Sequence, residues 1–204
     1  MAGGTTPPQG STRFVETTRG VLSFQQLAPL LAERALQIQE DIEEGRFAMC
    51  PLDETLLQDL HQRLCGDLLP DLAGRWRTIA VRVSDHEPPP AHQVLALMRD
   101  YALDLATRGV GAPPDNDDLF IETLAFAEGR LLSVHPFHDF NGRVTRLWLA
   151  EILRRAEWPL PDLVPGDEPG KQIYLRALAA VDKRDYRPLM EIWRQRFGGA
   201  NLET

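Results

Sequence analysis

The stretch that decides the fold reads HPFHDFNGRVTR and occupies residues 135–146. A helical apolar pattern ends at its His-Pro step and a new one begins near Asn141, so the stretch predicts a loop between two helices. The N–H groups of Asn141, Gly142 and Arg143 have no partner within a helix that begins there, and the helix dipole favours negative charge at that end. The spacing therefore predicts a binding site for an anion.

The side chains of this stretch indicate that the anion is a nucleotide polyphosphate. Arg143 and Arg146 are three residues apart and share a helix face, so both guanidinium groups can reach one polyphosphate. Asp139 offers the hard oxygen ligand that Mg²⁺ prefers when it bridges phosphates. His135 can take a proton from an attacking hydroxyl, because imidazole changes its charge near neutral pH. These residues predict transfer of part of a nucleotide to a hydroxyl group.

The same stretch resembles the Fic family signature HxFx(D/E)(G/A)NGRxxR at every defined position except one. The matching residues are His135, Phe137, Asp139, Asn141, Gly142, Arg143 and Arg146. At the remaining position Phe140 stands where the family has Gly or Ala. A bulky side chain there is expected to narrow the phosphate-binding turn, although its backbone can still serve the anion site.

The resemblance implies a role for each residue. His135 is the general base that deprotonates a Ser, Thr or Tyr hydroxyl of a target protein, Asp139 binds Mg²⁺, and Arg143 and Arg146 hold the distal phosphates of ATP. Phe140, Asn141 and Gly142 are counted with the phosphate-binding residues, and Phe137 anchors the loop on the core. The phosphorylating Doc branch has Asn-Lys-Arg where this chain has Asn-Gly-Arg, which favours transfer of AMP over transfer of phosphate.

The remaining sequence predicts an all-α, Fic-type helical bundle with one short β-hairpin. Apolar residues at helical spacing predict helices over 23–45, 51–66, 91–107, 115–135, 141–157, 171–178 and 188–197. The resemblance covers roughly residues 24–197. A single domain over 21–198 is expected, with a flexible tail over 1–20, which is rich in Gly, Thr, Pro and Ser, and a short tail over 199–204.

The hairpin is predicted at TIAVRV, where β-branched residues precede three prolines. Its residues are Thr78, Ile79, Ala80, Val81, Arg82 and Val83. The resemblance identifies it as the flap, whose exposed edge pairs with an extended segment of the target protein and presents the hydroxyl to His135. The alternative is that this segment is only a loop that connects the neighbouring helices. Arg75 and Arg77 either assist the phosphates or face solvent.

Composition excludes some partners. The net charge of −8 argues against nucleic acid and membrane surfaces as general partners, because both require a basic face. No signal peptide or apolar run long enough to span a membrane is present. The two cysteines, Cys50 and Cys65, are predicted to be buried apolar residues. A bacterial, cytoplasmic protein is expected, or an effector delivered to another cell.

Tyr174, the mode of inhibition and the reaction itself each keep more than one interpretation. Tyr174 either lines the adenine pocket or is a core aromatic residue, and His61, His86 and His92 are interpreted as ordinary polar residues. Many Fic proteins carry an inhibitory motif, (S/T)xxxE(G/N), and the nearest match, Gln39-x-x-x-Glu43, is poor. Either autoinhibition is absent or a separate antitoxin chain supplies the glutamate.

The leading hypothesis is a Mg²⁺-dependent protein adenylyltransferase. The alternatives are a catalytically impaired nucleotide-binding module and an enzyme that uses UTP, GTP or a phosphocholine donor.

Overall fold

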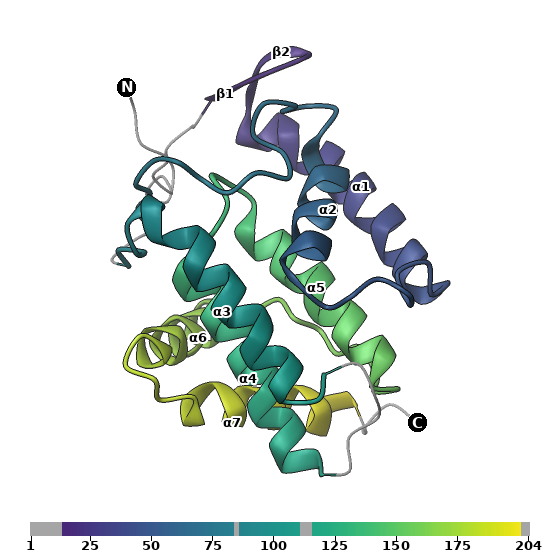
Figure 1. Ribbon diagram of the computed structural model, residues 1–204, viewed down its shortest axis with the longest axis vertical. Coiled ribbons are helices and arrows are strands. Elements are labelled where there is room, and N and C mark those ends of the chain that lie inside the picture. The colour runs from purple at the N-terminus through teal and green to yellow at the C-terminus, as the bar shows by residue number, and fades with distance from the viewer. Residues whose placement is uncertain (1–13, 84–85, 111–115, 201–204) are drawn as a thin grey trace.

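The computed structural model describes residues 14–83, 86–110 and 116–200 (Figure 1). It is a helical bundle, as the sequence predicts, with one small antiparallel sheet near the amino end of the described residues. The strands are β1 (Phe14–Thr17) and β2 (Gly20–Ser23), and a short 3-10 helix η1 (Ala91–Gln93) leads into α3. The helices are α1 (Phe24–Glu43), α2 (Glu54–Cys65), α3 (Val94–Thr107), α4 (Asp117–Val134), α5 (Asn141–Arg155), α6 (Glu168–Val181) and α7 (Arg187–Ala200).

Helix α5 forms the centre of the bundle. It lies between α1 and α2 on one side and α4 on the other (Figure 1). Its apolar residues, from Val144 to Leu153, are buried, so packing them removes a large apolar area from water. Trp148 is fully buried and donates a hydrogen bond to the hydroxyl of Tyr101 in α3 (2.8 Å), which donates to the carbonyl of Ala127 in α4 (2.9 Å). This chain of bonds satisfies the buried polar atoms where the three helices meet.

Helix α4 carries the chain to the motif. The side chain of Asn116 caps its first turn by accepting from the N–H of Leu119 (3.0 Å). Gly129 lets α6 and α7 pack closely on it, because a Cβ there would lie 2.7 Å from Val181 and 3.1 Å from Leu189. Close packing fixes where α4 ends, and the motif begins at that end.

The β-hairpin lies at the amino end of the described chain (Figure 1). Predicting a flexible tail over residues 1–20 is therefore wrong for residues 14–20, whereas residues 1–13 lie outside the described residues. Val15 and Leu22 are partners in the hairpin and pack against the core. Gly20 has a φ of +94°, which a side chain rarely allows, at the turn between the strands.

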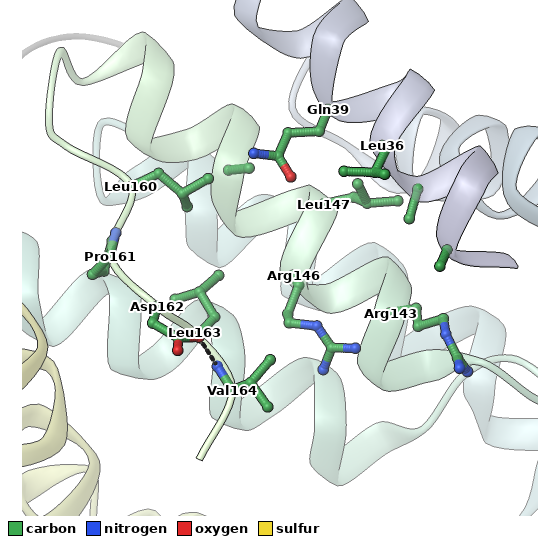
Figure 2. A pocket seen from close by; sticks show the side chains of 13 residues that line it. Leu36, Gln39, Arg143, Arg146, Leu147, Leu160, Pro161, Asp162, Leu163 and Val164 are labelled. Carbon is green, nitrogen blue, oxygen red and sulfur yellow. Dashed lines mark hydrogen bonds between the residues drawn. The ribbon is translucent and has the colours of Figure 1, made fainter. Parts of the chain in front are cut away.

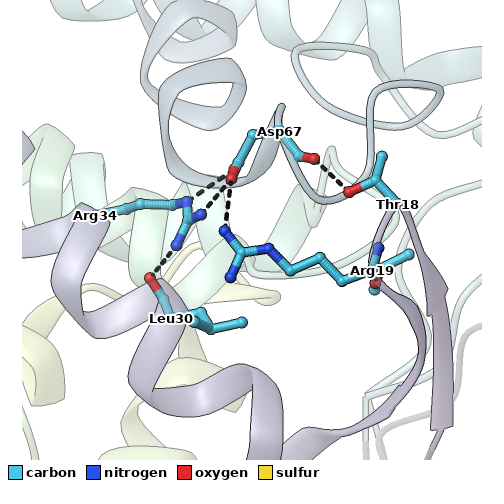
Figure 3. A network of polar contacts seen from close by, with 6 residues as sticks. Thr18, Arg19, Leu30, Arg34 and Asp67 are labelled. Atoms are coloured by element: carbon cyan, nitrogen blue, oxygen red, sulfur yellow. Dashed lines mark hydrogen bonds and ion pairs between the residues drawn. The ribbon is translucent and has the colours of Figure 1, made fainter.

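The turn of this hairpin is held by the segment that follows α2 (Figure 3). The N–H of Thr18 donates to the carbonyl of Leu68 (3.0 Å), and its hydroxyl donates to the carbonyl of Asp67 (2.6 Å). The carboxylate of Asp67 pairs with Arg34 of α1 and lies 3.9 Å from Arg19. These contacts come from residues far away in the sequence, which is why local composition does not reveal the hairpin.

The predicted hairpin, at Thr78–Val83, forms no named strand among the described residues. Among the described residues of this region, only Val83 and His86 pair, through N–H to carbonyl bonds of 3.0 and 2.9 Å. The carbonyls of Ile79 and Pro89 instead accept hydrogen bonds from the side chain of Arg77. We call residues 77–90 the flap segment, of which residues 84–85 lie outside the described part.

No helix in the described part of the chain has the length and apolar character needed to cross a membrane.

Candidate active site

The motif forms a tight loop between α4 and α5, as the sequence predicts. Residue His135 ends α4 with a φ of +50°, and Phe140 precedes α5 with a φ of +60°. The side chain of Asn141 closes the loop by accepting from the N–H of Phe137 and donating to its carbonyl, both at 2.9 Å. This side chain is buried, so only the backbone of Asn141 can serve an anion.

The start of α5 provides backbone donors. The N–H groups of Asn141 and Gly142 have no acceptor within the helix, because they belong to its first turn. The N–H of Arg143 donates to the carbonyl of Phe140 (3.0 Å), so its predicted availability to an anion is wrong. The tight turn thus leaves two of the three expected N–H groups, those of Asn141 and Gly142, available to an anion.

The two motif arginines converge near these donors. A Cβ added to Gly142 would lie 3.8 Å from Nη1 of Arg146, so this guanidinium group is beside the helix start. Burial lowers the pKa of Arg143, and the positive charge of Arg146 lowers it further, whereas Asp139 raises it. A guanidinium group whose charge is destabilised by burial and by a neighbouring arginine indicates a site that an anion would stabilise.

Arg143 and Arg146 line a cavity of about 620 Å³ between α1, α5 and the segment 160–164 (Figure 2). The side chain of Gln39 in α1 also faces it, and the rest of the wall is mainly apolar. Glu43, the acidic residue of the poor inhibitory match, is exposed, accepts a hydrogen bond from Gln39 (3.2 Å) and is not part of the wall. We call this the arginine cavity.

The ring of Phe140 lies in the core. It is 5% exposed and packs against Phe24 of α1, with ring centroids 6.2 Å apart. The guanidinium carbon of Arg143 lies 5.9 Å from the centre of the same ring. The expected narrowing of the phosphate turn by this side chain is therefore wrong, because the left-handed backbone turns the ring inward.

A histidine outside the motif supports the loop. Nδ1 of His61 accepts from the N–H of Gly74 (2.9 Å), so the ring proton is on Nε2, which donates to the carbonyl of Asp139 (3.2 Å). The ring also stacks on Phe137, which is 1% exposed and contacts Trp76 as well. The predicted anchor role of Phe137 is confirmed. The sequence gives no signal for the role of His61, because its partners are brought to it by the fold.

The imidazole of His135 lines a second cavity, of about 730 Å³, between the flap segment, the end of α4 and α6. Its ring lies near enough to the backbone of Leu132 for that backbone to raise its pKa. Burial is the main cause that lowers the pKa of His135 to about 4, and the charges of nearby His86 and Arg77 contribute to this shift. The ring is therefore neutral at pH 7 and able to accept a proton. We call this the histidine cavity.

Asp139 is the only acidic residue of the motif. One of its carboxylate oxygens accepts from the N–H of Phe140 (2.9 Å), which fixes the side chain at the loop. Across the described residues, no group of three or more His, Cys, Asp or Glu side chains could hold a metal ion. A single carboxylate suits Mg²⁺ when phosphate and water oxygens complete its coordination.

Arg77 joins the flap segment to the motif. Its Nε donates to the carbonyl of His135 (2.8 Å), its Nη2 to the carbonyls of Val134 (3.3 Å) and Pro89 (2.5 Å), and its N–H to the carbonyl of Pro136 (2.8 Å). It is 3% exposed, so both sequence interpretations, a phosphate contact and a solvent-facing residue, are wrong. Nothing in the sequence indicates a buried arginine that binds only carbonyls.

The other predicted residues lie around this centre. In the flap, the side chains of Thr78, Ile79, Ala80 and Arg82 are exposed, whereas Val81 is buried. The hydroxyl of Tyr174 donates to Glu128 (2.7 Å), and the wall of neither cavity includes this tyrosine. Burial and Glu128 raise its pKa well above the ordinary value. Its assignment to the nucleotide stays a prediction.

The chain is similar in sequence to known proteins. The family model described as Fic/DOC family matches residues 51–153. A protein adenylyltransferase Fic from Nematostella vectensis is 28% identical over 191 residues, which cover 89% of this chain and 43% of that protein. The chain thus spans less than half the length of this relative.

Solved structures share the fold. The amino-terminal FIC domain of the effector Bep8 from Bartonella sp. 1-1C aligns with a TM-score of 0.72 over 93% of both chains, at 14% identity. BepC from Bartonella tribocorum, solved with bound AMPPNP, aligns with a TM-score of 0.70 over 92% of this chain and 93% of that chain, at 16% identity.

Proposed function

We propose that this chain, which belongs to the Fic/DOC family, transfers AMP from ATP to a hydroxyl group of a target protein. The observation that carries the proposal is a single loop that holds a half-buried His135, neutral at pH 7, at one end and leads at its other end into the start of α5, where the two arginines lie. The name of the Nematostella vectensis relative, a protein adenylyltransferase, supports it. The bound AMPPNP of the BepC structure supports a nucleotide as the donor.

The polyphosphate binds at the start of α5. The N–H groups of Asn141 and Gly142 face an anion there, and the helix dipole adds to their attraction. Arg143 and Arg146 bind the β- and γ-phosphates from the arginine cavity. Their charges stabilise the pyrophosphate as its negative charge grows during the reaction.

The nucleoside occupies the histidine cavity. A nucleotide whose distal phosphates contact the arginines must place its α-phosphorus near His135, and the nucleoside then extends past this residue. A volume of about 730 Å³ suffices for a nucleoside. Its wall includes apolar side chains from two sides, Val83 of the flap segment and Leu175 and Leu178 of α6.

The chemical step moves one proton and exchanges one bond to phosphorus. The free nitrogen of His135 takes the proton from the target hydroxyl while its oxygen forms a bond to the α-phosphorus. The bond from the α-phosphorus to the bridging oxygen breaks, and pyrophosphate leaves with that electron pair.

We further propose Mg²⁺ as the cofactor. Asp139 fits it, since its carboxylate is held at the loop within the range at which it raises the pKa of Arg143. When bound, the ion supplies positive charge to the phosphates and orients them. One carboxylate is enough because Mg²⁺ usually keeps several water ligands and binds the phosphates of its substrate.

The partner proposals follow from the two cavities. The target protein docks on the exposed residues of the flap segment, at Thr78, Ile79 and Ala80, which brings its hydroxyl to His135. An inhibitory glutamate from a separate antitoxin chain would pair with the arginines of the other cavity. Neither nucleic acid nor a membrane is required in this scheme.

The test uses two labels on ATP. Incubating the protein with a bacterial lysate and ATP labelled at the α-phosphate should label target proteins, whereas ATP labelled at the γ-phosphate should not. His135→Ala should abolish the signal and His92→Gln, an exposed control, should keep it. Equal labelling by wild type and His135→Ala would refute the proposal. Labelled UTP, GTP and CDP-choline, tested in parallel, would reveal a different donor.

A further inference from the structure

The arginine cavity extends well beyond the start of α5, where we propose that the phosphates bind. Helices α1 and α5 run side by side in the same direction (Figure 1). Phe24 contacts Phe140 at their starts, and a Cβ added to Gly45, just beyond the end of α1, would lie 3.7 Å from Arg154 near the end of α5. The cavity follows α5 from Arg143 as far as Ala150. Seven residues of an α-helix span about 10 Å, so a large part of the cavity lies past the arginines.

This farther part of the cavity is apolar. Its wall combines side chains of α1, α5 and the segment 160–164, namely Ala32, Ala35, Leu36, Leu147, Ala150 and Leu163 (Figure 2). The three alanines have side chains too short to fill the space between the two helices. At the rim, Leu36 is 62% exposed and Val164 is 55% exposed. A ligand that covers these two side chains would gain free energy by removing apolar surface from water.

The arginines of α5 differ in their partners. Near the end of the helix, Arg154 and Arg155 both bind the buried carboxylate of Glu151, at 2.9 and 2.6 Å. At its start, neither Arg143 nor Arg146 forms an ion pair with any residue that the structure describes. Both are half-buried and face the cavity, so a carboxylate or phosphate of a ligand can form charge-assisted hydrogen bonds with them.

The remaining polar residues of the wall do not neutralise these arginines. The carboxylate of Asp162 accepts a hydrogen bond from the N–H of Val164 (2.8 Å), which holds it on its own segment (Figure 2). The amide of Gln39 is uncharged, and its nitrogen donates to Glu43, which lies outside the wall. The described wall therefore has two positive charges and one negative charge, a balance that favours an anionic head group.

The two parts of the cavity together restrict the class of ligand. A longer polyphosphate would bring charged oxygens against an apolar wall that has no donors for them, which is unfavourable. A wholly apolar ligand would cover the arginines without pairing their charges, which is also unfavourable. A molecule with an anionic group at one end and an apolar chain at the other satisfies both parts.

We propose that the arginine cavity binds an amphiphilic anion of the class of a medium-chain fatty acid. The carboxylate binds Arg143 and Arg146, and the alkyl chain lies past Leu147 toward Ala150. The volume of about 620 Å³ is within the range of small-molecule sites. Because the carboxylate occupies the place of the distal phosphates, the fatty acid and the nucleotide exclude each other. This last consequence rests on the proposed function.

Calorimetry with decanoate, below the concentration at which it forms micelles, tests the site directly. Decanoate should bind to the wild type. Acetate, which has the head group alone, and decanol, which has the chain with an uncharged head, should each bind at least about tenfold more weakly. Equal binding of acetate would mean that the arginines recognise a carboxylate alone, as in a glutamate side chain, and would refute the proposal. Equal binding of decanol would refute it as well.

Variants at the apolar rim separate the chain site from the phosphate site. Leu36→Gln and Val164→Gln change exposed side chains, so both proteins should fold, as circular dichroism and thermal unfolding will show. Each should weaken decanoate binding about fivefold and leave AMPPNP binding unchanged. Leu103→Gln, a matched change of a leucine that is 61% exposed on α3, should bind decanoate as the wild type does. Wild-type affinity for decanoate in both rim variants would contradict the proposed position of the chain.

Competition between decanoate and AMPPNP tests the shared arginines. Decanoate at about ten times its own Kd should raise the apparent Kd of AMPPNP about tenfold. Binding of both ligands without competition would mean that the carboxylate does not occupy the phosphate site, and the proposal would be wrong.

The two proposals can fail independently. If decanoate binds with the expected pattern of variants and AMPPNP does not bind at all, the proposed function fails and the fatty-acid site stands. If AMPPNP binds and decanoate does not, the fatty-acid site is refuted and the proposed function is unaffected.

Discussion

The ring of His61 lies flat against the ring of Phe137, with centroids 3.9 Å apart and planes inclined by 2°. This stack joins α2 to the motif loop, and the hydrogen bond from Nε2 of His61 to the carbonyl of Asp139 joins them a second time. His61, 78 positions away in the sequence, thus fixes the backbone at Asp139, whose carboxylate we propose as the Mg²⁺ ligand. The loop is held from outside the motif as well as from within.

Replacing His61 by leucine should loosen that loop. The variant loses the stack and leaves the N–H of Gly74 and the carbonyl of Asp139 without this partner, which should lower the free energy of unfolding by about 2 kcal/mol. AMP transfer should then require more Mg²⁺ to reach half its maximum. Urea unfolding and a Mg²⁺ titration of the labelling reaction measure both effects. An unchanged Mg²⁺ requirement would argue against a positioning role.

Two histidines with lowered pKa values, the buried His61 and the half-buried His135, should make the fold sensitive to acid. Burial lowers the pKa values of His61 and His135 from 6.5 to about 4, so the unfolded chain binds protons between these pH values that the folded protein does not. The stability that these neutral histidines give the folded protein is fully present above pH 6.5. It is lost as the pH falls toward 4, and the free energy of unfolding then declines by roughly 3 kcal/mol per histidine. Urea unfolding at pH 7.5 and 4.5 measures this decline.

The variant His61→Leu separates the two contributions. It should be less stable than the wild type at pH 7.5 but lose about half as much stability on acidification. His92→Gln, which changes an exposed ring, serves as the control and should reproduce the wild-type decline. A wild-type decline in His61→Leu would mean that His61 does not contribute to the acid sensitivity.

The pH profile of the reaction should differ between the free and the loaded enzyme. In the free protein His135 has a pKa of about 4, so kcat/KM should not fall until the pH approaches 5. A bound polyphosphate adds negative charge nearby and raises this pKa, so the acid limb of kcat should lie at higher pH. Steady-state rates between pH 4.5 and 8 provide both curves. Coincident acid limbs would contradict this placement of the phosphates.

Replacing Phe140 by glycine tests the inward orientation of its ring. Glycine adopts the observed φ of +60° without strain, but the change removes a buried ring from its contact with Phe24. We expect a net loss of about 3 kcal/mol in unfolding free energy and no gain in transfer activity. Thermal unfolding and the labelling assay decide this. A several-fold rise in activity would show that the ring does obstruct the phosphates.

Arg77→Met should loosen the contact between the flap segment and the end of α4. The methionine fills part of the space but leaves the carbonyls of Val134 and His135 without their donor, at a cost of about 2 kcal/mol. Protection of the flap segment from hydrogen exchange should fall at both pH 6 and pH 8. Arg77→Lys should recover only part of the protection, since one ammonium group cannot reach every carbonyl.

The helices and the motif loop could be predicted because their signals are local. The apolar spacing around Leu147 and Trp148 marks a buried helix, and the step from His135 to Asn141 marks the break before it. The orientation of Phe140 could not be predicted, because it depends on a left-handed backbone and on a partner in α1.

Long-range contacts explain the remaining differences. Local composition at residues 14–20 resembles a tail, but Thr18 binds the backbone of Leu68 and Asp67. The sequence at 78–83 resembles a strand, but Arg77 takes carbonyls that a hairpin would use. A buried arginine without a carboxylate partner is rare in proteins, so composition favours an exposed position for Arg77.

The contacts of Glu128 limit how far the chain can be truncated from its carboxyl end without a loss of stability. Its carboxylate, 2% exposed in the middle of α4, receives hydrogen bonds from Arg196 of α7 (2.8 and 3.2 Å) and from Tyr174 of α6. A fragment cut at residue 153, where the family match ends, would carry this negative charge inside the bundle with neither partner, at a cost of about 3–5 kcal/mol. Expression fragments therefore have to retain the chain through Arg196, well past the last residue of the recognised motif.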